Sequence, residues 1–177
     1  MKVPPSVFGF ILVFLAVCCV SDIRTRRIPN ALSRPTILAG LLLNSLWFGV
    51  PGFVNSVFGV LLMVAALIGP FALGGIGGGD VKMMAAVGAL VGPQLALASL
   101  GMGMAIGGVL MAIHLVRLGR LREKLGATAG MIWNAVTSVS LEPLRVPAAD
   151  ASNAVTLPYS VPLGLGTLAV LGLVCRG

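Results

Sequence analysis

Long blocks without charged residues dominate the chain. Short stretches that hold nearly all the Asp, Glu, Lys and Arg residues separate these blocks, which cover 3–21, 35–79, 83–116 and 151–175. One transmembrane helix needs about 20 apolar residues, so the blocks have room for one, two, two and one helices. The pattern predicts an all-α, polytopic integral membrane protein with about six transmembrane helices.

Glycine and proline mark where the two longest blocks must turn. We place the breaks at Val50-Pro51-Gly52 and at Gly92-Pro93, because these residues punctuate regular structure. The prediction is a single transmembrane domain over 1–177, with cytoplasmic loops at 22–34 and 117–154 and helices at about 3–21, 35–50, 53–74, 81–93, 95–116 and 155–174. The fourth helix is short, about 18 Å at 1.5 Å per residue against a core of about 30 Å, and a re-entrant segment is the alternative there.

The charged residues indicate the direction of the chain through the membrane. The sequence has 12 Lys and Arg against 5 Asp and Glu, and 10% of its residues are charged, which excludes an ordinary soluble enzyme with about 25%. Lys and Arg gather in cytoplasmic loops, and ten of the twelve fall where this topology is cytoplasmic. We therefore expect the N-terminus to lie on the outer side of the membrane. The expected partners include membrane lipid and no nucleic acid.

Two acidic residues stand apart from the polar loop at 117–154, which holds the other three. Asp22 and Asp80 lie at the predicted cytoplasmic ends of helices, and ionisable groups at a membrane suggest function. Two close carboxylates tend to hold one proton between them, which is the state that aspartic proteolysis uses. One carboxylate acts as general base while the other polarises the scissile carbonyl. This chemistry needs no metal and no cofactor, and the sequence has no C-x-x-C pair that would predict zinc.

Structural roles stay open for the same residues. Asp80 could be the N-cap of a helix, and Asp22 could pair with Arg26 one helical turn later. The run Gly77-Gly78-Gly79 could be a flexible turn, or it could let substrate backbone approach Asp80 closely. Lys82 could anchor to phosphate headgroups or bias the protonation of Asp80.

Three short motifs resemble those of the type IV prepilin peptidases. The first, at 22–30, is DIRTRRIPN, which resembles the family's D-x-x-x-x-x-I-P-N stretch. The second is Gly77-Gly78-Gly79-Asp80-Val81-Lys82, which matches a G-x-G-D motif followed by Val-Lys. The third, LPYSVPLG at 157–164, is similar to a late P-Y-x-x-P-x-x-x-G stretch. They occur in the family's order and cover most of the chain.

The resemblance implies an intramembrane aspartyl endopeptidase, with the metal-independent chemistry described above. Such enzymes cleave the leader peptide of prepilins or pseudopilins at the cytoplasmic face of the bacterial inner membrane, in type IV pilus and protein secretion systems. By position, Asp22 and Asp80 are the catalytic pair, and Gly77, Gly79 and Lys82, with Gly78 between the two glycines, shape the site. Because the paired C-x-x-C motifs of the bifunctional members are absent, the chain is similar to the small, methyltransferase-lacking peptidases of tight-adherence (Flp-type) pilus systems.

Two other functions use the same residues differently. A non-enzymatic membrane scaffold of a pilus or secretion assembly would use the aspartates only to cap helices. A small proton-coupled transporter would use them to carry protons, although transporters favour sites near the bilayer midplane. The sequence indicates no oligomeric state.

Overall fold

The computed structural model describes residues 5–25, 28–73, 76–117 and 159–176. These ranges form the helical elements α1 (Pro5–Thr25), α2 (Asn30–Ala72), α3 (Gly78–Arg117) and α6 (Ser160–Arg176), and they contain no strand. The predicted all-α class is confirmed for this part of the chain. The predicted loop at 117–154 lies outside the described residues, apart from Arg117 at the end of α3.

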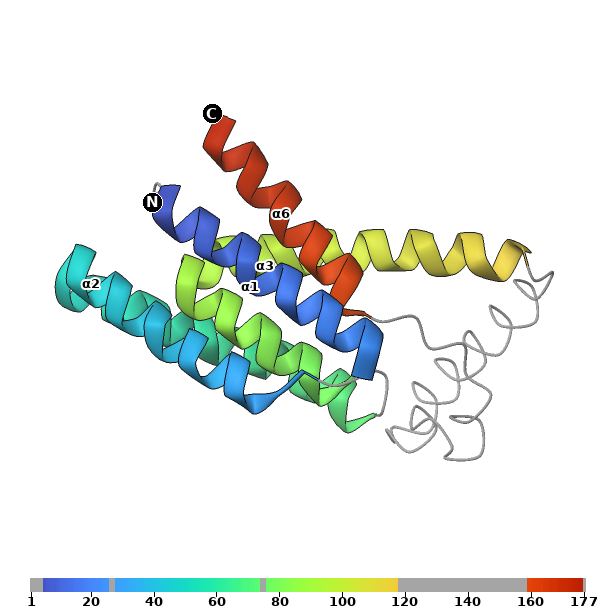
Figure 1. The fold of residues 1–177 in the computed structure, drawn as a ribbon, viewed down its shortest axis with the longest axis horizontal. Helices are drawn as coiled ribbons and strands as arrows, with labels where there is room; N and C mark the ends of the chain where they lie inside the picture. Colours follow the sequence, from blue (N-terminus) through green and yellow to red (C-terminus); the bar gives the residue numbers. More distant parts are fainter. Residues whose placement is uncertain (1–4, 26–27, 74–75, 118–158, 177) are drawn as a thin grey trace, which may run out of the picture.

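α2 and α3 each consist of two helical segments joined at one glycine. Gly49 (φ 64°, ψ −148°) and Gly92 (φ 79°, ψ 174°) have backbone angles that residues with a side chain rarely adopt. Figure 1 shows that the chain reverses direction within each element. A hydrogen bond of 2.7 Å from Asn44 Nδ2 to Ser56 Oγ crosses the α2 reversal, which one straight helix would not allow at 1.5 Å rise per residue. The reversals lie beside the first predicted break and within the second.

The helix ends differ from the predicted ones. α1 continues to Thr25 and α2 begins at Asn30, so the prediction of a loop over 22–34 is wrong for most of that range. The amides of Leu32 and Ser33 donate to the Pro29 carbonyl oxygen at 3.0 and 3.4 Å, which starts α2 directly after the proline. Charged residues are compatible with helix ends, so a charge-free block marks only the apolar part of a helix.

The first residue of α3 also differs from the predicted one. α3 begins at Gly78 instead of 81, because the amides of Asp80 and Val81 donate to the Gly77 carbonyl oxygen. The described part of α6 begins at Ser160, and the predicted start near 155 lies outside the described residues.

Close backbone-to-backbone packing is found where α2 crosses α3. A Cβ atom added to Gly59 would overlap the carbonyl oxygen of Gly88, and a Cβ added to Gly88 would overlap the carbonyl oxygen of Gly59. In lipid, small residues let helices approach backbone to backbone. Around this crossing the core is filled by fully buried side chains, among them Ile11, Leu15, Met63, Leu67, Met83, Met84, Val87 and Leu171.

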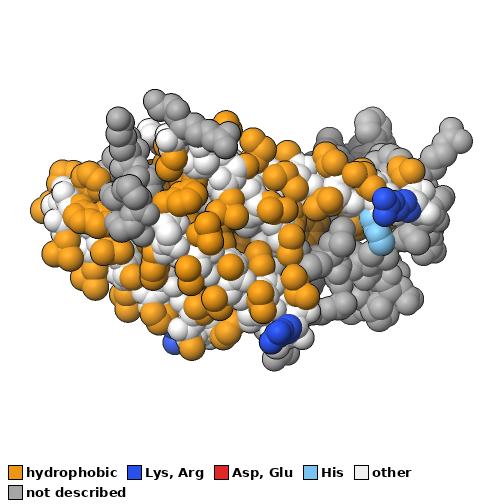
Figure 2. All heavy atoms as spheres, turned by 45° about the horizontal axis from the view of Figure 1, so that its top comes forward, with side chains coloured by type: hydrophobic (Ala, Val, Ile, Leu, Met, Phe, Trp, Pro, Cys, Tyr) orange, Lys and Arg blue, Asp and Glu red, His pale blue; other side chains and the backbone are white. Residues whose placement is uncertain are grey.

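The outer surface is strongly apolar. Leu46, Val50 and Leu173 are 80%, 75% and 66% exposed, and Figure 2 shows hydrophobic side chains over nearly all of the described part of one face. Helices α1, α2 and α3 are long and apolar enough to cross a membrane, and α6 is a shorter apolar helix. Such a surface suits contact with lipid, so the fold is compatible with a membrane protein.

Candidate active site

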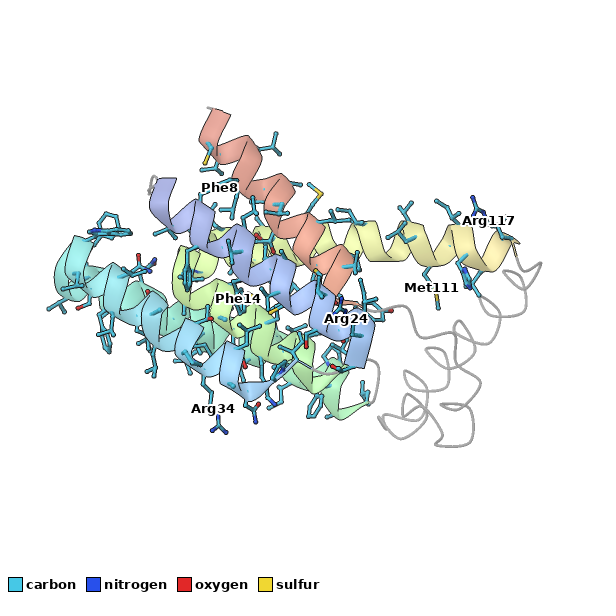
Figure 3. All side chains as sticks on the ribbon, viewed as in Figure 1. Phe8, Phe14, Arg24, Arg34, Met111 and Arg117 are labelled. Carbon is cyan, nitrogen blue, oxygen red and sulfur yellow. The ribbon has the colours of Figure 1, made fainter. Side chains whose placement is uncertain are left out.

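Four helix ends meet at one end of the molecule. The C-terminal end of α1 and the beginnings of α2, α3 and α6 gather there (Figure 1). Figure 3 labels Arg24 near the C-terminal end of α1 and Arg34 near the beginning of α2. Because α2 reverses at Gly49, it returns the chain to the end from which it started. This reversal puts the beginning of α3 beside the end of α1.

A cavity of about 550 Å³, which we call the aspartate pocket, opens between these ends. Its lining comes from α1, from the segments that precede α2 and α3, and from the first turns of both helices: Asp22, Thr25, Ile28, Pro29, Asn30, Gly77, Gly78, Gly79, Asp80 and Lys82. All six site residues predicted from the sequence lie in this one pocket. The sequence did not predict Thr25 as part of it.

Asp80 lies in the first turn of α3 and is 7% exposed. Its position at a helix N-terminus is favourable for a carboxylate, because the helix dipole is positive there. A Cβ atom added to Gly77 would lie 3.3 Å from Asp80 Oδ2, so the Gly77 backbone borders the carboxyl group. Since α3 begins at Gly78, Asp80 stands inside the helix, and the alternative that it is the N-cap is wrong.

Asp22 is half-buried on the last turn of α1. Its Oδ2 accepts a hydrogen bond of 2.6 Å from the hydroxyl of Ser160, the first residue of α6. The carboxyl groups of Asp22 and Asp80 are close enough to interact electrostatically. The alternative pairing with Arg26 involves a residue outside the described ranges.

Ser160 is a contact of the site that the sequence did not reveal. The only signal was its position inside the motif at 157–164, which gives no indication that its hydroxyl reaches Asp22. Cys19 adds a second link between the same helices, because its Sγ donates a hydrogen bond of 3.4 Å to the Ser160 carbonyl oxygen. The start of α6 therefore braces α1 close to Asp22.

The first two motifs pack against each other. A Cβ atom added to Gly79 would lie 3.2 Å from Ile28 Cγ1 and 3.3 Å from the Ile28 amide nitrogen. Ile28 is buried at 5% exposure, and Pro29 starts α2 through its carbonyl oxygen. The I-P-N segment thus forms the pocket wall that faces the glycine segment, while Lys82 is exposed at the rim.

The pocket brings two carboxyl groups to a space that a peptide can enter. One is buried and the other is half-buried, and both come from helix ends. Within the described ranges, no three His, Cys, Asp or Glu side chains are grouped to hold a metal ion. Chemically, the arrangement suits proton transfer to and from a substrate bound between the two carboxyls.

Comparisons with known proteins agree with the motifs. Residues 9–113 match the type IV leader peptidase family. The chain is also 31% identical over 124 residues to the prepilin leader peptidase/N-methyltransferase of Bacillus subtilis (strain 168), in an alignment that covers 68% of this chain and 48% of the relative. The chain therefore spans about half the length of this curated relative. No solved structure matches it. The resemblance read from the three motifs is confirmed, and the chain belongs to the type IV leader peptidase family.

Proposed function

We propose that this protein is a membrane-embedded aspartyl endopeptidase that removes the leader peptide of prepilins. The observation that carries the proposal is the meeting of Asp22 and Asp80, from separate helices, in one pocket of a type IV leader peptidase family member. A proton-coupled transporter would need such carboxyls near the middle of the membrane. The aspartate pocket instead lies at the ends of the helices.

The reaction uses one ionised and one protonated carboxyl group. The carboxylate takes a proton from water as the water oxygen bonds to the scissile carbonyl carbon, and the carboxylic acid gives its proton to the carbonyl oxygen. In the second step the C–N bond breaks. The first carboxyl returns its proton to the leaving nitrogen, and a hydroxyl of the tetrahedral intermediate returns one to the second carboxyl. The products are a carboxylic acid and an amine, and the pair regains its starting state.

The glycine segment gives the substrate access to this pair. Hydrolysis requires an extended peptide whose carbonyl reaches both carboxyl groups. Gly77 is exposed and borders Asp80 without a side chain, so a substrate backbone can approach the carboxyl from that side. The pocket is lined both by polar side chains, such as Asp22 and Lys82, and by the apolar Ile28 and Pro29, which suits a junction between a polar leader and an apolar helix.

The proposed setting is the bacterial inner membrane, with the pocket toward the cytoplasm and the N-terminus outside. Arg24, Arg34 and Lys82 belong to the pocket's end of the helices, and basic residues favour the cytoplasmic side. The proposed substrates are prepilins or pseudopilins of tight-adherence pilus systems. These have a short basic leader, then glycine, then an apolar helix.

Cleavage in cells tests the function. The chain is co-expressed with a tagged prepilin of the tight-adherence type, and leader removal is followed by electrophoretic mobility and by the N-terminal sequence of the product. We expect cleavage by the wild-type chain and none by Asp22→Asn or Asp80→Asn, because each substitution keeps the shape and removes the ionisable group. Full cleavage by either variant would reject the aspartyl mechanism. Absence of cleavage by the wild type would favour a non-enzymatic scaffold.

Orientation is tested separately by cysteine labelling. In a chain without its native cysteines, Thr25→Cys at the pocket end should react with a membrane-impermeant maleimide only after the inner membrane is opened. Val50→Cys, at the α2 reversal, is the matched control and should react in intact spheroplasts. The opposite result would reverse the proposed topology.

A further inference from the structure

Ser160 lies behind the catalytic pair and does not line the aspartate pocket. It is completely buried, and its hydroxyl donates to Asp22 Oδ2 at 2.6 Å. This is a short hydrogen bond between two oxygen atoms. The contact joins the end of α1 to the beginning of α6, across 138 positions of the chain.

The Ser160 hydroxyl is held in place on Asp22. Cys19, one helical turn before Asp22 on α1, lies 3.4 Å from the Ser160 carbonyl oxygen. A Cβ atom added to Gly164 would lie 3.1 Å from Cys19 Sγ, so the first turn of α6 packs directly on α1. Cys19 therefore holds the backbone of Ser160 through its carbonyl oxygen, and Asp22 holds its side chain through the hydroxyl.

The two carboxyl groups of the pair have unequal surroundings. Asp22 is half-buried and accepts a hydroxyl hydrogen bond, which stabilises the ionised form of a carboxyl. Asp80 is 7% exposed, and burial favours the neutral form, while the N-terminus of α3 acts in the opposite direction and favours the carboxylate. Among the described residues, the other titratable or charged groups on these helix ends include Cys18, Cys19 and Arg24 on α1, Lys82 on α3, and Tyr159 directly before α6.

We propose that Ser160 is a positioning residue that holds Asp22 as the ionised general base, so that the shared proton lies on Asp80 as the acid. This inference rests on the proposed peptidase function and assigns the two roles within it. Water then gives its proton to Asp22, and the scissile carbonyl oxygen receives its proton from Asp80. Ser160 keeps its own proton throughout and orients Oδ2 of Asp22.

Ser160→Ala tests this role with purified protein in detergent and a prepilin substrate. Loss of a hydrogen bond to a charged group predicts a fall in kcat of about 10- to 100-fold, with little change in KM because Ser160 does not line the pocket. Ser160→Cys keeps a weak donor of similar shape and should fall between the wild type and Ser160→Ala. The matched control is Thr167→Val, which removes an equally buried α6 hydroxyl that donates to Leu163 of its own helix, and it should retain wild-type kcat.

The pH profile of kcat tests the assignment of roles. The acidic limb reports the group that must be ionised, so in Ser160→Ala that limb should move while the basic limb stays. Movement of the basic limb alone would assign Asp22 as the acid and overturn the proposal. Wild-type kcat in Ser160→Ala, or an equal loss in Thr167→Val, would also overturn it. These failures differ from failure of the proposed function, in which Asp22→Asn and Asp80→Asn still cleave.

Discussion

The pocket end of the molecule and the crossing of α2 and α3 use glycine in opposite ways. At the crossing, Gly59 and Gly88 leave no room for any added atom. At the pocket, Gly77 is exposed, and the space beside it ends at the carboxyl oxygen of Asp80. In one region the absence of a side chain closes a helix contact, and in the other it keeps a reactive group accessible.

The difference separates the contact that holds the fold from the pocket that we propose performs the chemistry. The crossing is a contact of apolar helices in which backbone meets backbone. The pocket contains the buried carboxyl of Asp80 and the exposed amine of Lys82, groups that a lipid-facing helix contact does not need. Substitutions at the crossing should therefore reduce stability, and substitutions at the pocket should reduce activity while the fold persists.

The largest expected effect is on catalysis, in Asp80→Asn. We expect a loss of prepilin cleavage of at least about 10³-fold, because general acid–base groups contribute about 10²–10⁴ and the reaction needs both carboxyls. The thermal midpoint in detergent should not fall, because Asn has the same shape and removes a buried ionisable group. A clear fall in the midpoint would show that Asp80 also holds the fold and would weaken the comparison.

The next largest effect is on stability, in Gly59→Val. The side chain would overlap the backbone of Gly88, which cannot shift as a flexible side chain can, so the helices must separate. Overpacking costs about 1–3 kcal/mol, and we expect the upper end. The measurement is the amount of protein in the membrane and its thermal midpoint. Gly69→Ala is the control on the same helix, because nothing lies within 4 Å of an added Cβ there.

Asn44→Leu should give a smaller loss of stability. The Asn44 amide donates to Ser56 Oγ at 2.7 Å, to the Ala89 carbonyl oxygen at 2.9 Å and to the Leu90 carbonyl oxygen at 3.2 Å, which joins the α2 reversal to α3. Interhelical hydrogen bonds in membranes contribute about 1–2 kcal/mol, and the thermal midpoint should fall accordingly. Thr36→Val removes a hydroxyl that donates within its own helix. If the thermal midpoint of Thr36→Val falls as far as that of Asn44→Leu, the hydrogen bonds from Asn44 to α3 are not what stabilises the packing of α2 on α3.

Gly77→Ala should produce the smallest of these effects, and only on activity. The added methyl group would lie 3.3 Å from Asp80 Oδ2, which requires a shift of a few tenths of an ångström and narrows the approach of the substrate. We expect cleavage to fall by about threefold, equivalent to about 0.7 kcal/mol in the barrier, with an unchanged thermal midpoint. Gly101→Ala, where an added Cβ meets nothing within 4 Å, should cleave normally.

The arrangement of the helices could largely be predicted from the sequence. The charge-free blocks and the Gly and Pro residues located both chain reversals to within a few residues. Counting crossings then brought Asp22 and Asp80 to the same end. Helix ends could not be located in this way, because α1 continues past the charged residues Asp22 and Arg24, so a charge-free block marks only the apolar part of a helix.

The long-range contacts could not be predicted. The sequence has 24 glycines, and nothing in the pattern distinguishes Gly59 and Gly88, which meet at the crossing, from Gly69, which has open space around it. The hydrogen bond between Ser160 and Asp22 likewise depends on how α6 packs on α1. Such packing is decided by the shapes of several helices at once and leaves no local periodic signal.

The link from Ser160 to Asp22 also relates the site to the order of synthesis. Asp22 leaves the ribosome early, Asp80 follows after the α2 reversal, and Ser160 comes with α6, the last of the described helices. A nascent chain that has inserted only α1 and α2 carries a single carboxyl, and one that has added α3 still lacks the brace on Asp22. With the proposed roles of Asp22 and Ser160, full proteolytic competence arrives only with the docking of α6, and we expect an incompletely inserted chain to be a poor protease toward its neighbours in the membrane.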